Sequence, residues 1–377
     1  MKHFIYSAII VLSLAFLAVN TTCFGETAEN RSVSNGCNVG AYYYPWYGDD
    51  FHGHHYIRER LVPPQKPELG EYNDSDPKVI AKHIEWSRYA GVGFWAASWW
   101  GPDSREDKTL REVILPHPNL GQLKIAVHYE TAGRTKDFTD YEYLYGDFLY
   151  LSRNYFNNPG YLRIEGKPVV FVYLTRVLAQ NGQLKDALMK MRSGARDGGY
   201  EIYIVGDHAF GAYSYLGVGF KGLDAITDYD VYGSIGVKGY AGEKALSAYM
   251  SRQSKWKKMA VKSGVDYFPS VTPGFNDAGV RDGHPPLSRK LTEDAPFGSL
   301  FEAMLRNAKN LQTPNKTSFI MVTSWNEWHE DTQIEPVEKA SPITKDDSKS
   351  GDALTYGLEY DGYGMLYLDV LKTFCGN

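Results

Sequence analysis

Strand-like and helix-like segments alternate along almost the whole chain, and this rhythm restricts the possible folds more than any other feature of the sequence. Eight short segments are apolar or rich in β-branched and aromatic residues, as buried parallel strands are. They span residues 38–47, 93–100, 123–130, 167–174, 200–207, 223–233, 266–274 and 318–323. Each is followed by a stretch with the spacing or the end signals of a helix. These stretches span residues 76–91, 106–115, 141–156, 183–196, 212–216, 242–263, 300–311 and 364–374.

Eight strands alternating with eight helices in one chain of 377 residues predict a single-domain (β/α)8 barrel, a TIM barrel of the α/β class. Long loops at the C-terminal ends of the strands would hold the remaining residues. The alternative is an open, doubly wound sheet, which usually carries a glycine-rich phosphate-binding turn after its first strand. The corresponding segment here, YYYPWYGDD (42–50), is bulky and aromatic, and it favours the barrel.

The N-terminus has the pattern of a secretory signal peptide. A basic start precedes an uncharged apolar run over residues 4–19, and residues 23–25 offer a cleavage position. We therefore expect residues 1–25 to be a signal peptide, residues 26–377 to be the mature domain, and the protein to be secreted or extracytoplasmic. The apolar run is also near the lower length limit of a membrane span, so a retained membrane anchor is the alternative.

Removal of the signal peptide would leave two cysteines, Cys37 and Cys375. Two residues provide neither a disulfide framework nor a cysteine-based metal site. In a (β/α)8 barrel the first strand begins, and the last helix ends, on the same face, so these cysteines would lie close together. In an oxidising compartment we expect them to form a disulfide.

The composition excludes one class of partner and favours another. The chain has a net charge of -5 and no basic run, so we do not expect it to bind nucleic acid. It contains 29 Tyr and 8 Trp, a bias that is typical of proteins that handle carbohydrates. We expect an oligosaccharide or polysaccharide partner, and contact with a membrane only through an uncleaved N-terminal segment.

The densest concentration of reactive side chains follows the last strand, in the segment SFIMVTSWNEWHEDTQIEP (318–336). Glu327 and Glu330 stand three residues apart just past the strand end, where one loop can hold both carboxylates over one substrate. Trp325 and Trp328 flank them. A sugar site needs carboxylates for proton transfer and flat apolar faces for the ring, whereas a packed core does not need this combination. The alternative is a solvated surface loop, which seldom carries two indoles.

Polar and aromatic residues also collect at the other strand ends, where barrel enzymes carry their chemistry. They are Tyr42, Tyr44, Trp46, Trp99, Trp100, His128, Glu130, Asp207, His208, Asp228, Tyr229 and Asp230. Each residue alone is a weak signal, but their convergence predicts a binding site. The histidines of HGHHY (52–56) and the pair His128 and Glu130 could suggest a metal. We expect neither a metal nor a cofactor, because histidines so close in sequence rarely face one ion and the pair lacks an evident third ligand.

At these residues the sequence resembles glycoside hydrolase family 99, the endo-α-1,2-mannosidases and mannanases. The motifs that carry the resemblance are YYYPWYG, ASWW, VHYE, FVYL, FPSVTPGFND and SWNEWHEDTQIEP, in this order over nearly all of the mature chain. The resemblance implies a (β/α)8 fold for residues 26–377, an extracytoplasmic location, catalysis without a metal, and retention of the anomeric configuration. The alternatives are a WbsX-type protein of polysaccharide biosynthesis, which shares the W-N-E-W core, and a non-catalytic carbohydrate-binding barrel.

The resemblance also implies roles for individual residues. Glu327 would act as a base toward the 2-hydroxyl of the substrate, which closes a 1,2-anhydro sugar, and Glu330 would act as the acid and then the base at the glycosidic oxygen. The residues expected to bind substrate are Tyr44, Trp46, His55, Trp99, His128, Glu130, Tyr229 and Trp328. Several aromatic faces on neighbouring strand ends further predict a groove with several sugar subsites and internal cleavage of long substrates.

Two residues depart from the family pattern. Asp331 replaces the glycine that usually follows the second acid, and Leu174 stands where an aspartate often follows the tyrosine of the fourth strand. We expect the negative charge of Asp331 to disfavour the ionised form of Glu330, and so to help keep Glu330 protonated.

Overall fold

The computed structural model describes residues 38–135, 141–211, 219–281, 283–313 and 317–376. Contacts group Val33–Asn377 into one unit, to which all of these residues belong. The signal peptide expected in residues 1–25 and the helix expected at 212–216 lie outside the described residues. Within the described ranges, no helix has the length and apolar character that a membrane span requires.

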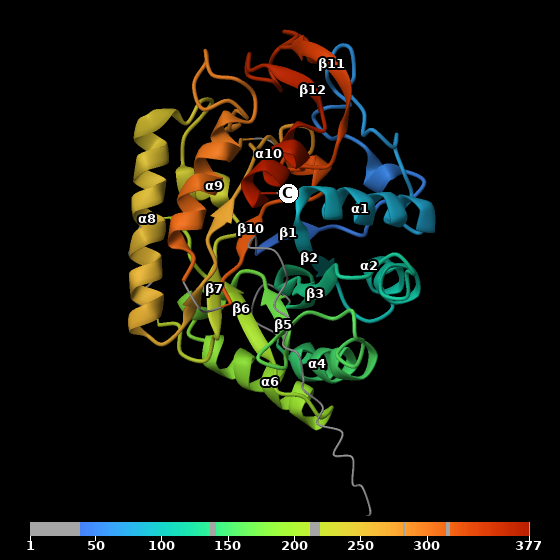
Figure 1. The fold of residues 1–377 in the computed structure, drawn as a ribbon, viewed down its shortest axis with the longest axis vertical. Helices are drawn as coiled ribbons and strands as arrows, with labels where there is room; N and C mark the ends of the chain where they lie inside the picture. The colour runs from blue at the N-terminus through green and yellow to red at the C-terminus, as the bar shows by residue number, and fades with distance from the viewer. Residues whose placement is uncertain (1–37, 136–140, 212–218, 282, 314–316, 377) are drawn as a thin grey trace, which may run out of the picture. The chain divides into compact units, whose positions relative to one another are not determined.

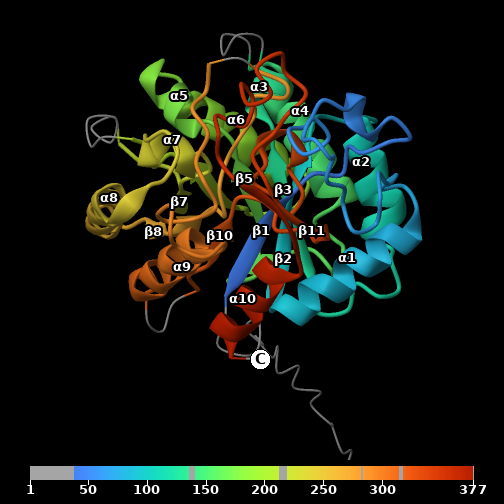
Figure 2. The same cartoon turned by 90° about the horizontal axis from the view of Figure 1, so that it is seen from above.

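The centre of the unit is a parallel sheet with eight strand positions (Figures 1 and 2). Seven positions are single strands, namely β1 (Val39–Tyr43), β2 (Val92–Trp99), β3 (Lys124–Tyr129), β5 (Lys167–Val172), β6 (Tyr203–Asp207), β7 (Ala225–Thr227) and β10 (Ile320–Val322). They lie in the order β7-β6-β5-β3-β2-β1-β10. A short β4 (Arg163–Ile164) adds to β5 in antiparallel fashion.

The remaining position is occupied by a strand in two pieces. β8 (Asp266–Tyr267) pairs with β7, and β9 (Ser270–Val271) pairs with β10. Between the pieces, the N–H of Phe268 donates to the carbonyl of Ile226, and the carbonyl of Pro269 accepts from the N–H of Met321. The split strand thus joins the two edges of the sheet, and the predicted (β/α)8 fold is confirmed.

Helices surround the sheet, as the view in Figure 2 shows. They are α1 (Pro77–Ala90), α2 (Arg105–Thr109), α3 (Thr131–Arg134), α4 (Tyr143–Asn154), α5 (Thr175–Gln180), α6 (Leu184–Asp197), α7 (Val231–Ile235), α8 (Gly242–Lys262), α9 (Ser299–Leu311) and α10 (Leu366–Cys375). The stretch expected as one helix at 106–115 is α2 followed by a π-helical turn at Leu110–Ile114.

Helix α1 shows why the end signals in the sequence were reliable. The carboxylate of Asp76 accepts a hydrogen bond from the N–H of Lys78 (2.8 Å), which satisfies a free donor of the first turn. Pro77 occupies the first helical position, where no N–H is needed. Gly91 ends the helix in the left-handed region (φ 78°), which a residue without a Cβ adopts without strain.

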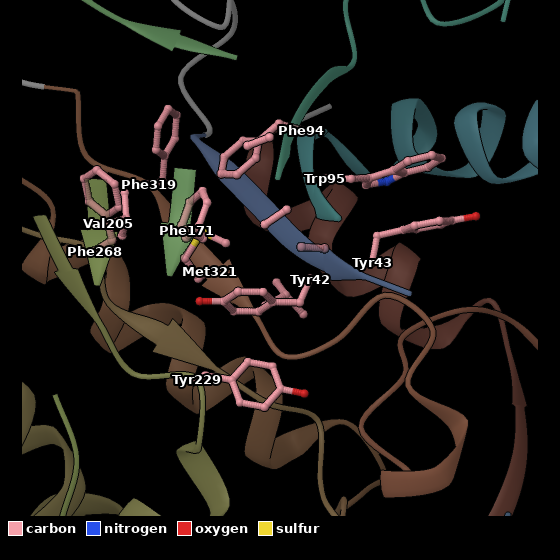
Figure 3. Close-up of a cluster of buried hydrophobic side chains, with 14 of the residues drawn as sticks. Tyr42, Tyr43, Phe94, Trp95, Phe171, Val205, Tyr229, Phe268, Phe319 and Met321 are labelled. Carbon is pink, nitrogen blue, oxygen red and sulfur yellow. The ribbon is translucent and has the colours of Figure 1, made fainter. Parts of the chain in front are cut away.

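Aromatic side chains fill the interior of the barrel in layers (Figure 3). In the layer near the N-terminal ends of the strands, the ring of Phe94 packs against Phe319, with 4.7 Å between the ring centroids. This ring lies where a Cβ on Gly40 would stand, only 2.0 Å away, so β1 needs glycine at this position. In the next layer, toward the C-terminal ends of the strands, Tyr42 packs against Tyr229 with centroids 4.9 Å apart, and it supports the residues at the strand ends.

Two features near the C-terminus complete the fold. An antiparallel hairpin of β11 (Val337–Ile343) and β12 (Tyr360–Gly364) follows β10, and the sequence rhythm did not predict it. Because Gly364 belongs to this hairpin, the last helix begins at Leu366 instead of at residue 364. Cys375, at the end of α10, is disulfide-bonded, while its expected partner Cys37 lies outside the described residues.

Candidate active site

A cleft of about 510 Å³ opens at the C-terminal ends of the barrel strands. Most of the residues that the sequence assigned to the site line it. They are Tyr44, Trp46, His55, His128, Glu130, Tyr229, Glu327 and Glu330. These residues come from the ends of four different strands, β1, β3, β7 and β10, or from the segments that follow them, and the barrel brings them together as its topology requires.

The loop after β10 folds back on itself and holds both acids over the barrel. The N–H of Ile334 donates to the carbonyl of Ser324 (3.0 Å), and the N–H of Thr332 donates to the carbonyl of Glu327 (3.3 Å). The hydroxyl of Ser324 also accepts a hydrogen bond from the N–H of Glu327 (2.8 Å). Glu327 and Glu330 therefore project from a short loop whose own hydrogen bonds fix their backbone.

Asn326 ties this loop to the end of β1. Its side-chain amide donates to the carbonyl of Tyr44 (3.0 Å) and accepts from the N–H of the same residue (2.8 Å). Its backbone carbonyl accepts from the hydroxyl of Tyr47 (2.6 Å). The two segments that carry the acids and the first aromatic wall are thus bonded to each other in a fixed register.

Glu330 has the surroundings of a carboxyl group that holds its proton near neutral pH. Burial and the nearby carboxylate of Glu327 raise the pKa of Glu330 to about 8, although the guanidinium of Arg281 acts in the opposite direction. One oxygen of Glu330 accepts from Arg281 (3.1 Å) and the other from the hydroxyl of Tyr229 (3.4 Å). A group of this kind can serve as a general acid.

Glu327 lies in the same cleft with few partners. Its Oε1 accepts a hydrogen bond from the N–H of His329 (3.0 Å), and Nδ1 of the same histidine lies 3.6 Å away. Among the ion pairs of the described residues, the imidazole of His329 is the only partner of the Glu327 carboxylate. A buried carboxylate with this little compensation is suited to accept a proton.

The floor of the cleft is formed by His128 and Glu130 at the end of β3. Burial lowers the pKa of His128 to about 3, so the ring is neutral, and neither of its nitrogens has a hydrogen-bond partner. Burial raises the pKa of Glu130 to about 8, an effect that the hydrogen bond from Ser98 (2.7 Å) opposes and the two cleft acids reinforce. These uncommitted polar atoms can bind sugar hydroxyls.

The walls of the cleft are aromatic. The hydroxyls of Tyr44 and Tyr229 are hydrogen-bonded to each other. Trp46 stacks on the ring of His52, with centroids 4.3 Å apart and planes at 5°, and the indole N–H of Trp46 has no partner. His55 belongs to the same exposed rim, where its N–H donates to Glu59 (2.7 Å).

The prediction for Trp99 is corrected by one residue. Trp99 is completely buried, and its indole N–H donates to Asp107 (2.8 Å) behind the wall of the cleft. Trp100 lines the cleft instead, with its indole N–H bonded to Ser98 (2.9 Å). Because side chains alternate along a strand, Ser98 and Trp100 share the face that looks into the cleft, and Trp99 points away from it.

The prediction that the two indoles around the acids face the sugar is also corrected. Trp325 and Trp328 are both completely buried. The indole N–H of Trp328 donates to Glu335 (2.8 Å), which also accepts from Tyr72 (2.8 Å) and is bonded to His83 (2.9 Å). These residues hold the loop in place from below, so Trp328 and Glu335 are structural.

The expected effect of Asp331 on Glu330 is wrong as well. The Asp331 carboxylate turns away from the cleft and pairs with Arg58 (2.6 Å) and Arg289 (3.2 Å), and both arginines are buried. Burial alone would raise the pKa of Asp331, but the two guanidinium groups hold it below its usual value. The raised pKa of Glu330 comes from its own burial and from Glu327 instead.

Several residues that line the cleft were not assigned to it from the sequence. Arg281 reaches Glu330 from the loop after β9, and no motif marked it. His329 stands inside the motif between the two acids, so its position was a usable signal. Tyr173 and Leu174 line the cleft, and the N–H of Leu174 donates to Asp207 (3.1 Å).

One group in the described part of the chain could hold a metal ion. His54 Nδ1 lies 3.3 Å from Glu59 and 3.8 Å from Glu71, and one ligand atom of each residue lies within 4.8 Å of the others. The group stands on the exposed rim, apart from the two acids. No step of the chemistry below depends on it.

A (β/α)8 barrel that holds a proton-bearing carboxyl beside a second carboxylate, in a cleft with aromatic walls, defines a glycoside hydrolase. The chain belongs to glycosyl hydrolase family 99, because the model of this family matches residues 49–349. The match covers both acids and the other cleft residues except Tyr44 and Trp46, which precede it.

Comparisons with known proteins agree with this assignment. The chain is 28% identical over 344 residues to the glycoprotein endo-alpha-1,2-mannosidase of Mus musculus, which covers 80% of this chain and 68% of that protein. It is 26% identical over 368 residues to a glycoprotein endo-alpha-1,2-mannosidase-like protein of Mus musculus, with 85% and 73% covered. The solved GH99 endo-alpha-mannosidase of Bacteroides thetaiotaomicron has a similar fold, with a TM-score of 0.63, 22% identity, and 89% and 95% of the two chains covered.

Proposed function

We propose that the protein is a retaining, endo-acting glycoside hydrolase that cleaves α-mannosidic linkages in mannan or mannose-rich glycans. The observation that carries the proposal is the pair of acids in the cleft. The pKa of Glu330 is raised to about 8, whereas Glu327, three residues away, keeps few partners. The relatives named endo-alpha-1,2-mannosidase support the choice of mannose.

In the first step, Glu330 gives its proton to the departing glycosidic oxygen. Glu327 accepts the proton of the 2-hydroxyl of the mannose, whose oxygen forms a bond to C1 while the bond from C1 to the glycosidic oxygen breaks. In a mannose unit the axial 2-hydroxyl stands trans to an α-linked leaving group, so it can attack from the opposite face. This route suits two acids that project from one short loop, because neither has to lie across the sugar as a nucleophile.

In the second step, water opens the 1,2-anhydro ring. The oxygen of the water bonds to C1 while Glu330 takes a proton from the water. The bond from C1 to O2 breaks, and O2 regains its proton from Glu327. Two inversions at C1 give overall retention. The neutral His128 ring and the protonated carboxyl of Glu130 on the cleft floor are positioned to bind the sugar hydroxyls during both steps.

We also propose that the enzyme works outside the cytoplasm. The disulfide bond of Cys375 supports this, because such bonds persist in oxidising compartments. The apolar N-terminal segment would then be a signal peptide or a membrane anchor. Cleavage after residue 25 would give a mature protein that begins at Glu26, which N-terminal sequencing of the exported protein can test.

The activity is tested by incubating the mature protein with a panel of α-mannans and glucosylated mannose oligosaccharides and by identifying the fragments. We expect internal cleavage, with α-configured products in the fresh hydrolysate. Glu327→Gln and Glu330→Gln should each lower the rate by on the order of a hundredfold or more, with substrate binding largely kept. Products of inverted configuration, or monosaccharide released only from chain ends, would contradict the proposal.

A further inference from the structure

His329 lies between the two acids in sequence and beside Glu327 in space. Its Nδ1 is 3.6 Å from Oε1 of Glu327, and this nitrogen is buried without a hydrogen-bond partner. A buried ring nitrogen without a partner is rare, because losing its contact with water costs free energy. Here it points at the carboxylate that the proposed mechanism uses as a base.

The tautomer of His329 follows from its other nitrogen. Nε2 lies 3.0 Å from the backbone carbonyl of His54, which can only accept a hydrogen bond. Nε2 must therefore carry the proton, and in the neutral ring Nδ1 carries a lone pair. With Glu327 ionised, a lone pair and a carboxylate oxygen face each other, and a proton placed between them would be held by both.

Aromatic rings fix the orientation of the imidazole. The ring of His329 lies parallel to Tyr47, with an interplanar angle of 6°, and meets His52 and Tyr56 edge to face. Among the described residues, the titratable side chains recorded against the ring are these three and Glu327, and His54 contacts it through its backbone carbonyl. Glu327 is the one acid among them, so it is the natural partner of Nδ1.

We propose that His329 is a positioning residue that shares with Glu327 the proton taken from the sugar 2-hydroxyl. This inference rests on the proposed function. In the first step the proton leaves the 2-hydroxyl as the C1–O2 bond forms, and it is held between Glu327 Oε1 and His329 Nδ1. In the second step it returns to O2 as water opens the ring. The separation of 3.6 Å has to shorten by less than 1 Å for a hydrogen bond, as contacts in free enzymes often do on substrate binding.

The kinetic test uses two variants of His329, one that loses the group at Nδ1 and one that loses the contact made by Nε2. His329→Gln keeps an amide donor near the His54 carbonyl but has no group at Nδ1, whereas His329→Asn places an amide oxygen near Nδ1 and loses the contact with the carbonyl. We expect His329→Gln to lower kcat about tenfold, less than the roughly hundredfold loss of a direct proton-transfer residue, with KM within about twofold. His329→Asn should keep more of kcat, because its oxygen can accept the shared proton.

The pH profile separates this role from simple support of the loop. A proton held by two groups is released at higher pH than one held by the carboxylate alone, so the acid limb of kcat/KM should move to lower pH in His329→Gln. The control is His117→Gln, because Nε2 of His117 also binds a carbonyl (3.0 Å, Pro77) while its Nδ1 already accepts from the N–H of Asn119 (3.1 Å). His117→Gln should leave both kcat and the limb unchanged.

A spectroscopic test does not depend on turnover. In protein labelled with 15N-histidine, His329 should show the Nε2–H tautomer near neutral pH, with its signal assigned by its loss in His329→Gln.

The outcomes distinguish the inference from the function on which it rests. If the wild type cleaves no α-mannan, the proposed function fails, and the tautomer of His329 still decides whether Nδ1 is free to accept a proton. If the wild type cleaves and His329→Gln matches it in kcat and in the acid limb, the proton-sharing role is wrong. A Nδ1–H tautomer of the neutral His329 ring also overturns it.

Discussion

Glu330 and Asp331 are neighbours in the chain, yet they occupy opposite electrostatic environments. Asp331 is buried between two guanidinium groups, those of Arg58 and Arg289, which hold its pKa below the usual value. Glu330 faces the cleft, and its burial beside Glu327 raises its pKa to about 8. The same loop thus contains a carboxylate that is fixed as an anion and a carboxyl that can hold a proton near neutral pH.

The same contrast separates Glu327 from Glu335. Glu335 is bonded to three side chains, those of Tyr72, His83 and Trp328, and it is completely buried. Glu327 has one backbone donor and one imidazole nearby. In this loop Asp331 and Glu335, whose carboxylates are bonded inside the fold, maintain the structure, and the two acids that face the cleft are those to which the proposed mechanism assigns proton transfer.

Asp331→Ala should have the largest effect on stability. It would leave Arg58 and Arg289 buried without a counter-ion, which costs about 3–5 kcal/mol of unfolding free energy. Glu330→Gln is the matched change at the neighbouring residue, and it should be neutral or stabilising at pH 7–8. Urea denaturation measures the free energy of unfolding of both variants. Equal losses of stability would contradict the different environments assigned to the two acids.

The pH dependence of the contribution of Glu330 to stability follows from its pKa. The folded-state pKa of about 8 lies above the ordinary value of 4.5. Between these values the folded protein keeps the proton and the unfolded chain releases it, so Glu330 makes the protein less stable as pH rises from 4.5 to 8. The advantage of Glu330→Gln in unfolding free energy should therefore grow over this pH range.

Glu335→Gln should destabilise the protein by about 1–3 kcal/mol, because an amide cannot accept from all of its present donors and introduces an N–H₂ group among them. The loop would lose part of its support, so kcat should fall by a smaller factor than in Glu327→Gln. Thermal unfolding and steady-state rates on one α-mannan measure both effects. A fall in kcat as large as that of Glu327→Gln, without loss of stability, would place Glu335 in the chemistry after all.

The two adjacent tryptophans at the end of β2, Trp99 and Trp100, offer a similar comparison with smaller expected effects. Trp100→Ala should raise KM about fivefold, equivalent to ~1 kcal/mol, because it removes a wall of the cleft. Trp99→Phe should leave KM unchanged and lower stability by about 1 kcal/mol, because the bond to Asp107 is lost. Reversed effects would mean that Trp99 faces the sugar.

Arg281→Met should have the smallest effect. Arg281 is half-exposed and opposes the rise in the Glu330 pKa, so its removal should move the alkaline limb of kcat/KM to higher pH. Below that limb the rate should stay within about twofold, because Glu330 is already protonated there. A limb that moved to lower pH would show that another group acts as the acid.

The fold could be predicted from the sequence because its signals are local. Helix α1 carries Asp76, Pro77 and Gly91 at the positions that begin and end a helix. The hairpin of β11 and β12 was missed because it interrupts the strand-and-helix rhythm after the last barrel strand. The pieces β8 and β9 read as one strand, since the break at Pro269 appears only when both neighbours are known.

The site could be predicted in part. Glu327 and Glu330 follow a strand end, and barrel topology alone places them over the cleft. The register of β2 against β3 pairs Ser98 with His128, which puts Trp100 and not Trp99 on the cleft side. Strand alternation could have supplied this answer.

The environment of Asp331 could not be predicted in the same way. Its partners, Arg58 and Arg289, lie far from it in the chain, and no local pattern links them. The direction of a side chain after a turn depends on such distant contacts. Asp331 itself adopts a positive φ of 48°, which directs its carboxylate toward the arginines instead of the cleft.

The most direct test of the mechanism is the rate of cleavage of a substrate that differs only by hydrogen in place of the 2-hydroxyl on the reacting mannose. With Glu327 acting on that hydroxyl, the wild-type enzyme should bind this substrate, as measured by competitive inhibition, and fail to cleave it. If a carboxylate of the enzyme attacked C1 itself, the 2-hydroxyl would not be a reactant, and the 2-deoxy substrate should still be cleaved, slowed only by the loss of hydrogen bonds to that hydroxyl. Cleavage of the 2-deoxy substrate by the wild-type enzyme, abolished in Glu327→Gln, would contradict the roles assigned to Glu327 and Glu330.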